Sequence, residues 1–153
     1  MKDFWKLFDN RVLGTAIIAW FIAQFLKIIL ALIKEKRLDL SRLTGSGGMP
    51  SSHSAFVVAM SFAIGYQSGF DSSVFALSAA FALVVMVDAA GVRRAAGTQA
   101  KMLNQIVVEL IEQGQLPEYE TLKELLGHTP VQVFAGAALG AAVATWWMRV
   151  LVG

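Results

Sequence analysis

The chain has 153 residues, of which 56% are hydrophobic, and its mean hydropathy is +0.60. Soluble domains use about 45–50% apolar residues, so this composition excludes a soluble protein of the ordinary kind. The formal net charge of +2 is too small to indicate nucleic-acid binding, and a chain with no cysteine can form neither disulfides nor cysteine metal sites.

The apolar residues gather in segments that are long enough, or nearly so, to cross a bilayer as helices. These segments cover about residues 12–33, 50–66, 74–88 and 130–152. We therefore predict an all-α integral membrane helical bundle with about four transmembrane helices plus interfacial helices. It is expected to form one membrane-embedded domain over residues 1–153. The first segment is longer than the core of a signal peptide and contains Gln24 and Lys27, so no cleavable signal is expected.

Two further segments are predicted to lie at the membrane surface. Residues 1–10 combine aromatic and charged side chains just before the first span, which is typical of an interfacial anchor. Residues 89–127 carry apolar side chains at helical spacing, which predicts an interfacial helical linker. Gly114 and Pro117 interrupt that pattern, and residues 118–126 are expected to form a short second helix.

The distribution of basic residues predicts the orientation. With four spans, both termini lie on one side of the membrane, and the linkers at 34–49 and 89–127 lie on the other. The linkers are richer in basic residues than the terminal segments: they carry Lys34, Lys36, Arg37, Arg42, Arg93, Arg94, Lys101 and Lys123, against Lys2, Lys6, Arg11 and Arg149. By the positive-inside rule, the linkers are therefore expected to be cytoplasmic in a protein of the cell (plasma) membrane.

The last span carries one small residue every four positions, at Gly136, Gly140 and Ala144. Such a stripe lets two helices approach closely. The contact is expected either within one chain or between two copies, which would make a homo-oligomer through these residues. The pattern does not distinguish the two.

Residues 45–54 lie before the second span and read Gly-Ser-Gly-Gly-Met-Pro-Ser-Ser-His-Ser. Pro50 is suited to the first turn of a helix, and free N–H groups at such a start attract an anion. Gly48 allows a close backbone approach, Ser51 and Ser52 offer hydroxyl groups, and His53 can hold or give a proton. The segment predicts a phosphate site. The plainer interpretation is a turn followed by a helix cap.

Ionisable side chains elsewhere favour the same ligand. Lys27 lies deep in the first span, where either phosphate binding or snorkelling to the surface would explain it. Asp88, Arg93 and Arg94 follow the third span and form either an ion pair for topology or an arginine grip on phosphate, with Asp88 orienting an arginine or a histidine. His128 opens the fourth span, as a cap or as a second catalytic histidine.

Three stretches together resemble the divergent type 2 phosphatidic acid phosphatase family, which is related to acid phosphatases and vanadium-dependent haloperoxidases. They are Gly47–Ala55, Asp88–Gly97 and Leu125–Pro130. The classical relatives share three motifs: Lys, six residues, Arg-Pro; then Pro-Ser-Gly-His; then Ser-Arg, five residues, His, three residues, Asp. Residues 50–53, Pro-Ser-Ser-His, are similar to the second motif.

The resemblance implies roles for individual residues. His53 matches the histidine that protonates the leaving group, and Lys27, followed after six residues by Lys34, resembles the first motif with Lys in place of Arg. The third motif is broken, because Arg94 lies far upstream of His128 and Gln132 stands where the family has Asp. His128 is assigned the nucleophile role, with Asp88 or Gln132 as its orienting residue.

Three functions are compatible with these residues. The first is a lipid phosphatase that hydrolyses a phosphomonoester or diphosphate head group by metal-independent histidine chemistry, with no cofactor. The second is a non-catalytic binder or carrier of a phosphorylated lipid on the same fold. The third is a structural membrane protein whose charges only set topology. The paired histidines and the buried lysine favour the first function.

Overall fold

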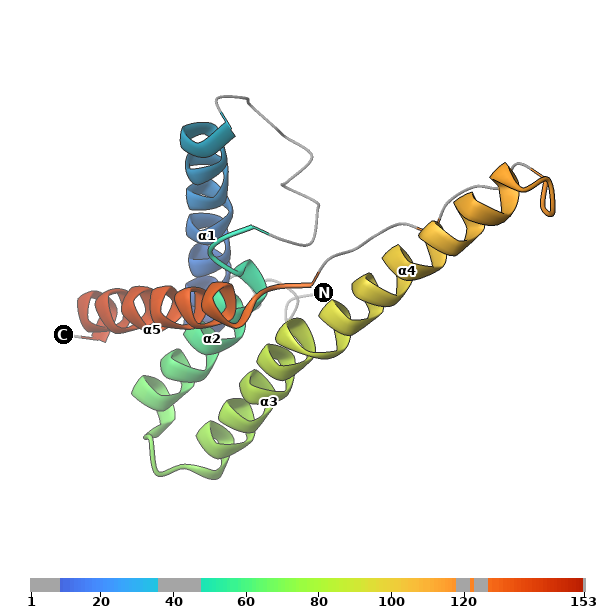
Figure 1. The fold of residues 1–153 in the computed structure, drawn as a ribbon. Coiled ribbons are helices and arrows are strands. Elements are labelled where there is room, and N and C mark those ends of the chain that lie inside the picture. Colours follow the sequence, from blue (N-terminus) through green and yellow to red (C-terminus); the bar gives the residue numbers. More distant parts are fainter. Residues whose placement is uncertain (1–8, 36–47, 118–121, 123–126, 153) are drawn as a thin grey trace, which may run out of the picture.

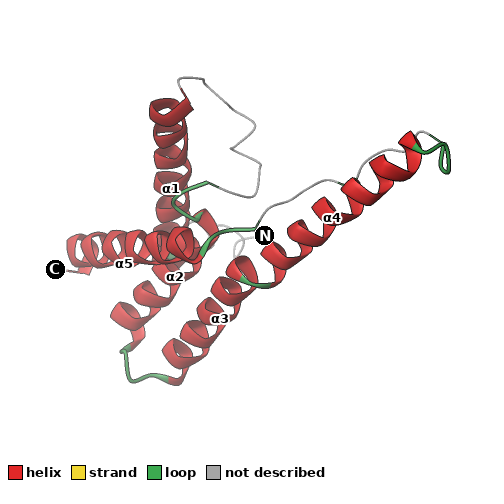
Figure 2. Ribbon diagram, in the orientation of Figure 1, coloured by secondary structure: helices red, strands yellow, loops and turns green. Residues whose placement is uncertain are grey.

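The computed structural model describes residues 9–35, 48–117, 122 and 127–152. Their regular structure consists of α1 (Arg11–Glu35), α2 (Ser52–Ser68), α3 (Ser73–Ala90), α4 (Val92–Glu112) and α5 (Pro130–Val152). Figure 2 shows that all of it is helical, which confirms the predicted all-α class. Each of the predicted spans corresponds to one of these helices, and the predicted helical linker contains α4. Apart from Asp9, Asn10 and the non-helical Leu122, the anchor at 1–10 and the short helix at 118–126 lie outside the described residues.

Helix α2 lies at the centre of the fold, in contact with α1, α3 and α5 (Figure 1). Its buried positions are nearly all small: Ser52, Ser54, Ala55, Val57, Ala59, Ser61, Ala63 and Gly65. Small side chains let neighbouring backbones approach closely, which is how helices pack when lipid removes the hydrophobic driving force between them. At the core, Ala59 meets Ala19 of α1 and Ala144 of α5.

The small-residue stripe of α5 packs on α2 of the same chain. A Cβ atom at Gly136 would lie 2.2 Å from the carbonyl oxygen of Ser51, and one at Gly140 would lie 2.3 Å from that of Ala55. These distances leave no room for any side chain, so the two backbones are in direct contact. The stripe therefore joins two helices within one chain, and this contact holds the start of α5 against the start of α2.

Helices α3 and α4 form one long, nearly straight rod, interrupted at Gly91, and α4 extends away from the other helices (Figure 1). Among the described helices, α4 contacts only α3. The Asn104 side chain of α4 donates to the Leu122 carbonyl and accepts from its N–H, each at 2.8 Å. Gly127 and His128 lie at the junction of α3 and α4, against the backbone of Arg94 and Ala89.

Within the described residues, three helical stretches are long and apolar enough to cross a membrane: Arg11–Ile33, Ser73–Glu112 and Pro130–Val150. Helix α2 has 17 residues and is shorter than these. A 40-residue stretch is about 60 Å long at 1.5 Å per residue, twice the hydrocarbon thickness, so α3 and α4 cannot both lie upright within one bilayer.

Candidate functional site

The segments that carry the predicted site residues meet at one place in the fold. The N–H of Ser51 donates to the carbonyl of Gln132 at 3.0 Å, which joins the start of α2 to the start of α5. The N–H of His128 donates to the carbonyl of Ala89 at 3.0 Å, which joins the residue before α5 to the end of α3. The first bond joins residues 81 positions apart in the sequence, and the second joins residues 39 positions apart.

Gly127 makes this meeting possible. A Cβ atom there would lie 2.4 Å from the backbone nitrogen of Arg94, at the first turn of α4. No residue other than glycine fits this approach without moving the backbone. Gly127 was not among the predicted site residues, although its position directly before His128 was a usable signal.

Lys27 projects from α1 into the same region and is only 3% exposed. Its side chain packs against Gly48: a Cβ atom there would lie 3.0 Å from Lys27 Cγ, and Gly48 has a φ of +82°. The Lys27 charge acts on both His53 and His128. This buried position does not match snorkelling to the surface, which was the other explanation that the sequence offered for Lys27. Lys34 also belongs to α1, but its side chain lies outside the described residues.

His53 is the second residue of α2 and is exposed, whereas the serines around it are buried. The charges of Arg93, Lys27 and Asp88 all act on its imidazole. Ser51 is the N-cap of α2, and its hydroxyl oxygen accepts from the N–H of Ser54 at 3.3 Å and from the Ser54 hydroxyl at 3.1 Å. The plainer interpretation of this segment as a helix cap is therefore correct for Ser51, and it coexists with the gathering of charges around His53.

Asp88 is paired with Arg93 across the junction of α3 and α4. Arg93 Nε lies 2.7 Å from Asp88 Oδ2, and both side chains are well exposed. Exposed pairs contribute at most about 1 kcal/mol of stability, so this contact matters more for the direction of the guanidinium than for the fold. Of the two partners that the sequence left open for Asp88, the geometry selects an arginine. Arg94 is exposed on the next position of α4.

His128 is 3% exposed, and its Nδ1 lies 3.2 Å from Oε1 of Gln132. The same Oε1 accepts from the N–H of Thr129 at 3.0 Å, and the N–H of Gln132 faces the Thr129 hydroxyl at 3.4 Å. This reciprocal pair is a capping box at the start of α5, followed by Pro130 at the first helical position. Sequence reasoning named Gln132 as an orienting residue but missed its capping role, which the Thr-x-x-Gln spacing indicated.

Burial lowers the pKa of His128 from its usual 6.5, and the charges of Lys27 and His53 lower it further. Hydrogen bonds to the Gln132 side chain and to the Gly48 backbone oppose these effects without cancelling them. His128 is therefore a neutral imidazole near pH 7, which is the form required of a nucleophile or a base.

The lowered pKa of His128 predicts a loss of stability in mild acid. As the pH falls below about 6.5, the unfolded chain takes up a proton at His128 before the folded chain does, so acid favours unfolding and stability rises with pH through this window. Denaturant unfolding between about pH 5 and pH 7 measures the effect. His128→Gln is expected to flatten the dependence, whereas Lys101→Met, at an exposed position of α4, serves as the comparison. An equal slope in wild type and His128→Gln would contradict the assignment.

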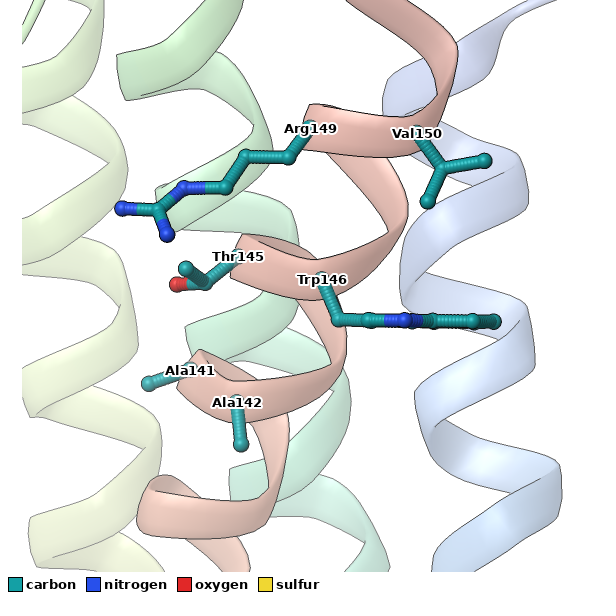
Figure 3. A pocket seen from close by; sticks show the side chains of 6 residues that line it. All are labelled: Ala141, Ala142, Thr145, Trp146, Arg149 and Val150. Atoms are coloured by element: carbon teal, nitrogen blue, oxygen red, sulfur yellow. The ribbon is translucent and has the colours of Figure 1, made fainter. Parts of the chain in front are cut away.

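A hollow of about 500 Å³ lies on α5, away from these residues. It is lined by Ala141, Ala142, Thr145, Trp146, Arg149 and Val150 (Figure 3). Arg149 follows His128 by 21 positions, which is about 30 Å along a helix, so the hollow lies near the opposite end of α5. None of the predicted site residues lines it. Within the described residues, no group of three or more His, Asp or Glu side chains is placed to hold a metal ion.

Comparison with known proteins agrees with the motifs at this site. The model of the divergent PAP2 family matches residues 8–143, which include every predicted site residue. The chain belongs to the divergent PAP2 family. It is also 42% identical over 145 residues to the uncharacterized membrane protein YuiD of Bacillus subtilis (strain 168), a match that covers 88% of this chain and 92% of YuiD. No solved structure matches the chain. Family membership and the apolar helices establish a membrane protein of this family.

Proposed function

We propose that this divergent PAP2 family member is a membrane lipid phosphatase that hydrolyses a phosphomonoester or diphosphate head group with two histidines. The observation that carries the proposal is the gathering of Lys27, His53, His128 and Arg93, from separate parts of the chain, within electrostatic reach of one another. Cations without a matching set of acids favour an anionic ligand, and imidazoles among them favour phosphoryl transfer.

The proposed reaction has two steps. In the first, Nε2 of His128 attacks phosphorus, the bond from phosphorus to the lipid oxygen breaks, and protonated His53 gives its proton to that oxygen. In the second, water attacks the phosphohistidine, His53 takes a proton from the water, and inorganic phosphate leaves His128. Lys27, Arg93 and Arg94 stabilise the charge on the equatorial oxygens, as phosphoryl transfer requires. Asp88 directs Arg93 toward this role.

The depth of Lys27 supports a substrate that reaches the site from the membrane. The apolar stretch of α1 continues from Lys27 to Ile33, which is about 9 Å further along the helix. Leu30, Leu32 and Ile33 on this continuation are 37%, 42% and 68% exposed. Exposed apolar residues between Lys27 and the end of this span are expected to contact lipid. A head group attached to a membrane-embedded tail therefore suits the site better than a soluble ester. By the positive-inside rule, we place the site at the cytoplasmic face of the plasma membrane.

The second candidate function is non-catalytic binding or transport of a phosphorylated lipid. Gln132 favours it, because an amide replaces the carboxylate that orients the nucleophile in the classical relatives. A binder uses the same cations and has no need of a proton donor at His53.

The test is phosphate release by purified protein in nanodiscs from phosphatidic acid, phosphatidylglycerol phosphate and a polyprenyl diphosphate, with EDTA present. Release from at least one lipid is expected, with loss of about 10²-fold or more in Lys27→Met, because one buried charge-stabilising group is removed. Lys101→Met is the matched control, because Lys101 lies exposed on α4. Absence of release from every lipid, with binding that depends on Lys27, would replace the phosphatase with the carrier.

A further inference from the structure

Helix α5 carries a second set of polar groups at the end far from His128. Its apolar stretch, Pro130–Val150, is about 30 Å long at 1.5 Å per residue, which matches the hydrocarbon core of a bilayer. Arg149 therefore lies at the membrane interface opposite the histidines. Helix α1 begins beside this end of α5, because the Thr15 hydroxyl lies 3.6 Å from the sulfur of Met148.

The hollow on α5 lies at this level and combines polar groups with a floor of small side chains. Arg149 and Thr145 are one helical turn apart, and Figure 3 shows the guanidinium and the hydroxyl on the same side of α5, with the indole of Trp146 directed to the other side. Ala141 and Ala142 belong to the preceding turn, and their methyl groups leave the hollow open. Its volume of about 500 Å³ lies within the range of small-molecule sites, about 300–1,000 Å³.

The charge of Arg149 indicates what the hollow binds. The guanidinium is exposed, and no acid among the described residues pairs with it. The plainer interpretation is an interfacial anchor, because cationic side chains and tryptophans are both common at membrane interfaces. An anchor, however, needs neither a hollow nor a hydroxyl group one turn away. A guanidinium next to a hydroxyl and an open hollow suits a phosphate group, which arginine binds through two parallel hydrogen bonds.

We propose that this hollow binds the head group of an anionic phospholipid, with Arg149 and Thr145 donating to the phosphate oxygens and Trp146 packing against the glycerol and the upper acyl chains. Lipid is the molecule that a bilayer presents to this surface, and the unpaired cation at head-group depth selects an anionic one. Arg149 lies about 30 Å from His128 along α5, so a lipid bound here is separate from the proposed substrate.

The experiment is tryptophan fluorescence of the full-length protein with Trp146 as its single indole, after Trp5, Trp20 and Trp147 are replaced with phenylalanine. Two vesicle preparations contain equal parts of phosphatidylglycerol and phosphatidylcholine and differ only in which lipid carries quenching bromine atoms near the head group. In about 1 M salt, where the Debye length is about 3 Å, general attraction of anionic lipid to the protein surface is screened. Phosphatidylglycerol is expected to be preferred next to Trp146 by about tenfold or more, as charge-assisted hydrogen bonds allow.

Three variants separate a lipid site from a charged surface. Arg149→Gln, which removes the charge, is expected to abolish the preference. Ala142→Leu, which keeps the charge and fills the hollow, is expected to abolish it as well. Arg11→Gln is the matched control: Arg11 is an exposed cation at the start of α1, at the same interface, and does not line the hollow. It is expected to leave the preference unchanged.

Three results would overturn the proposal. Equal quenching by the two brominated lipids in the protein with Trp146 alone would leave Arg149 as an interfacial anchor. A preference that survives Ala142→Leu would show attraction to charge without a site. Absence of quenching by either lipid, together with cross-linked dimers, would assign the hollow to a second copy of the chain. None of these measurements involves phosphate release, so their outcome is independent of the proposed phosphatase activity.

Discussion

Replacing His128 with alanine is expected to lower phosphate release by about 10²- to 10⁴-fold or more. The imidazole is buried between α3 and α5 and held at Nδ1 by Gln132, so no neighbouring side chain can take its place. His53→Ala is expected to lower release by a similar factor, because the leaving oxygen then departs without a proton. The measurement is the initial rate of phosphate release in nanodiscs.

The double variant sharpens this result. Residues that act in one step are not additive, so His53→Ala with His128→Ala is expected to be little slower than either single variant. A radiolabelled phosphohistidine can be trapped to identify the nucleophile. It is expected in wild type, at a lower rate of formation in His53→Ala, and not at all in His128→Ala. Labelling on His53 instead would reverse the two roles. Unchanged release in His128→Ala would refute the mechanism.

Gly136→Ala is expected to destabilise the protein by about 1–3 kcal/mol or more, although it adds a single methyl group. The new Cβ would lie 2.2 Å from the carbonyl oxygen of Ser51, which is backbone and cannot rotate away. Helix α5 must then shift relative to α2, and this shift strains the bond from Ser51 N–H to the carbonyl of Gln132. Denaturant unfolding in detergent measures the stability, and phosphate release measures the damage to the site.

Gly14→Ala provides a matched control in the same kind of structure. Gly14 lies within α1, and no atom lies within 4 Å of the position that its Cβ would take. An alanine there is expected to stabilise the protein by about 0.5–1 kcal/mol through helix propensity, which is the opposite sign. Equal effects at Gly14 and Gly136 would show that contact with α2 does not determine the cost.

The sequence by itself determined the class of the fold and the family. Long apolar segments predict helices because each can satisfy its backbone polar groups internally, and this property is local. The predicted fourth span begins at residue 130, as α5 does, whereas α2 begins at Ser52, two residues after Pro50, because Ser51 caps it. The motifs around His53, Arg93 and His128 were equally readable, and they identified the family before any contact was known.

Only the tertiary structure decided which of these residues touch one another. Asp88 had two candidate partners and pairs with Arg93, while Gln132 contacts His128. The stripe at Gly136 and Gly140 had two candidate surfaces and packs on α2 of its own chain. Periodicity places a residue on a face of its helix, but the partner of that face depends on packing between helices distant in the sequence. Close backbone contacts at Gly127 and Gly136, where a single methyl group would not fit, determine how these segments pack against one another.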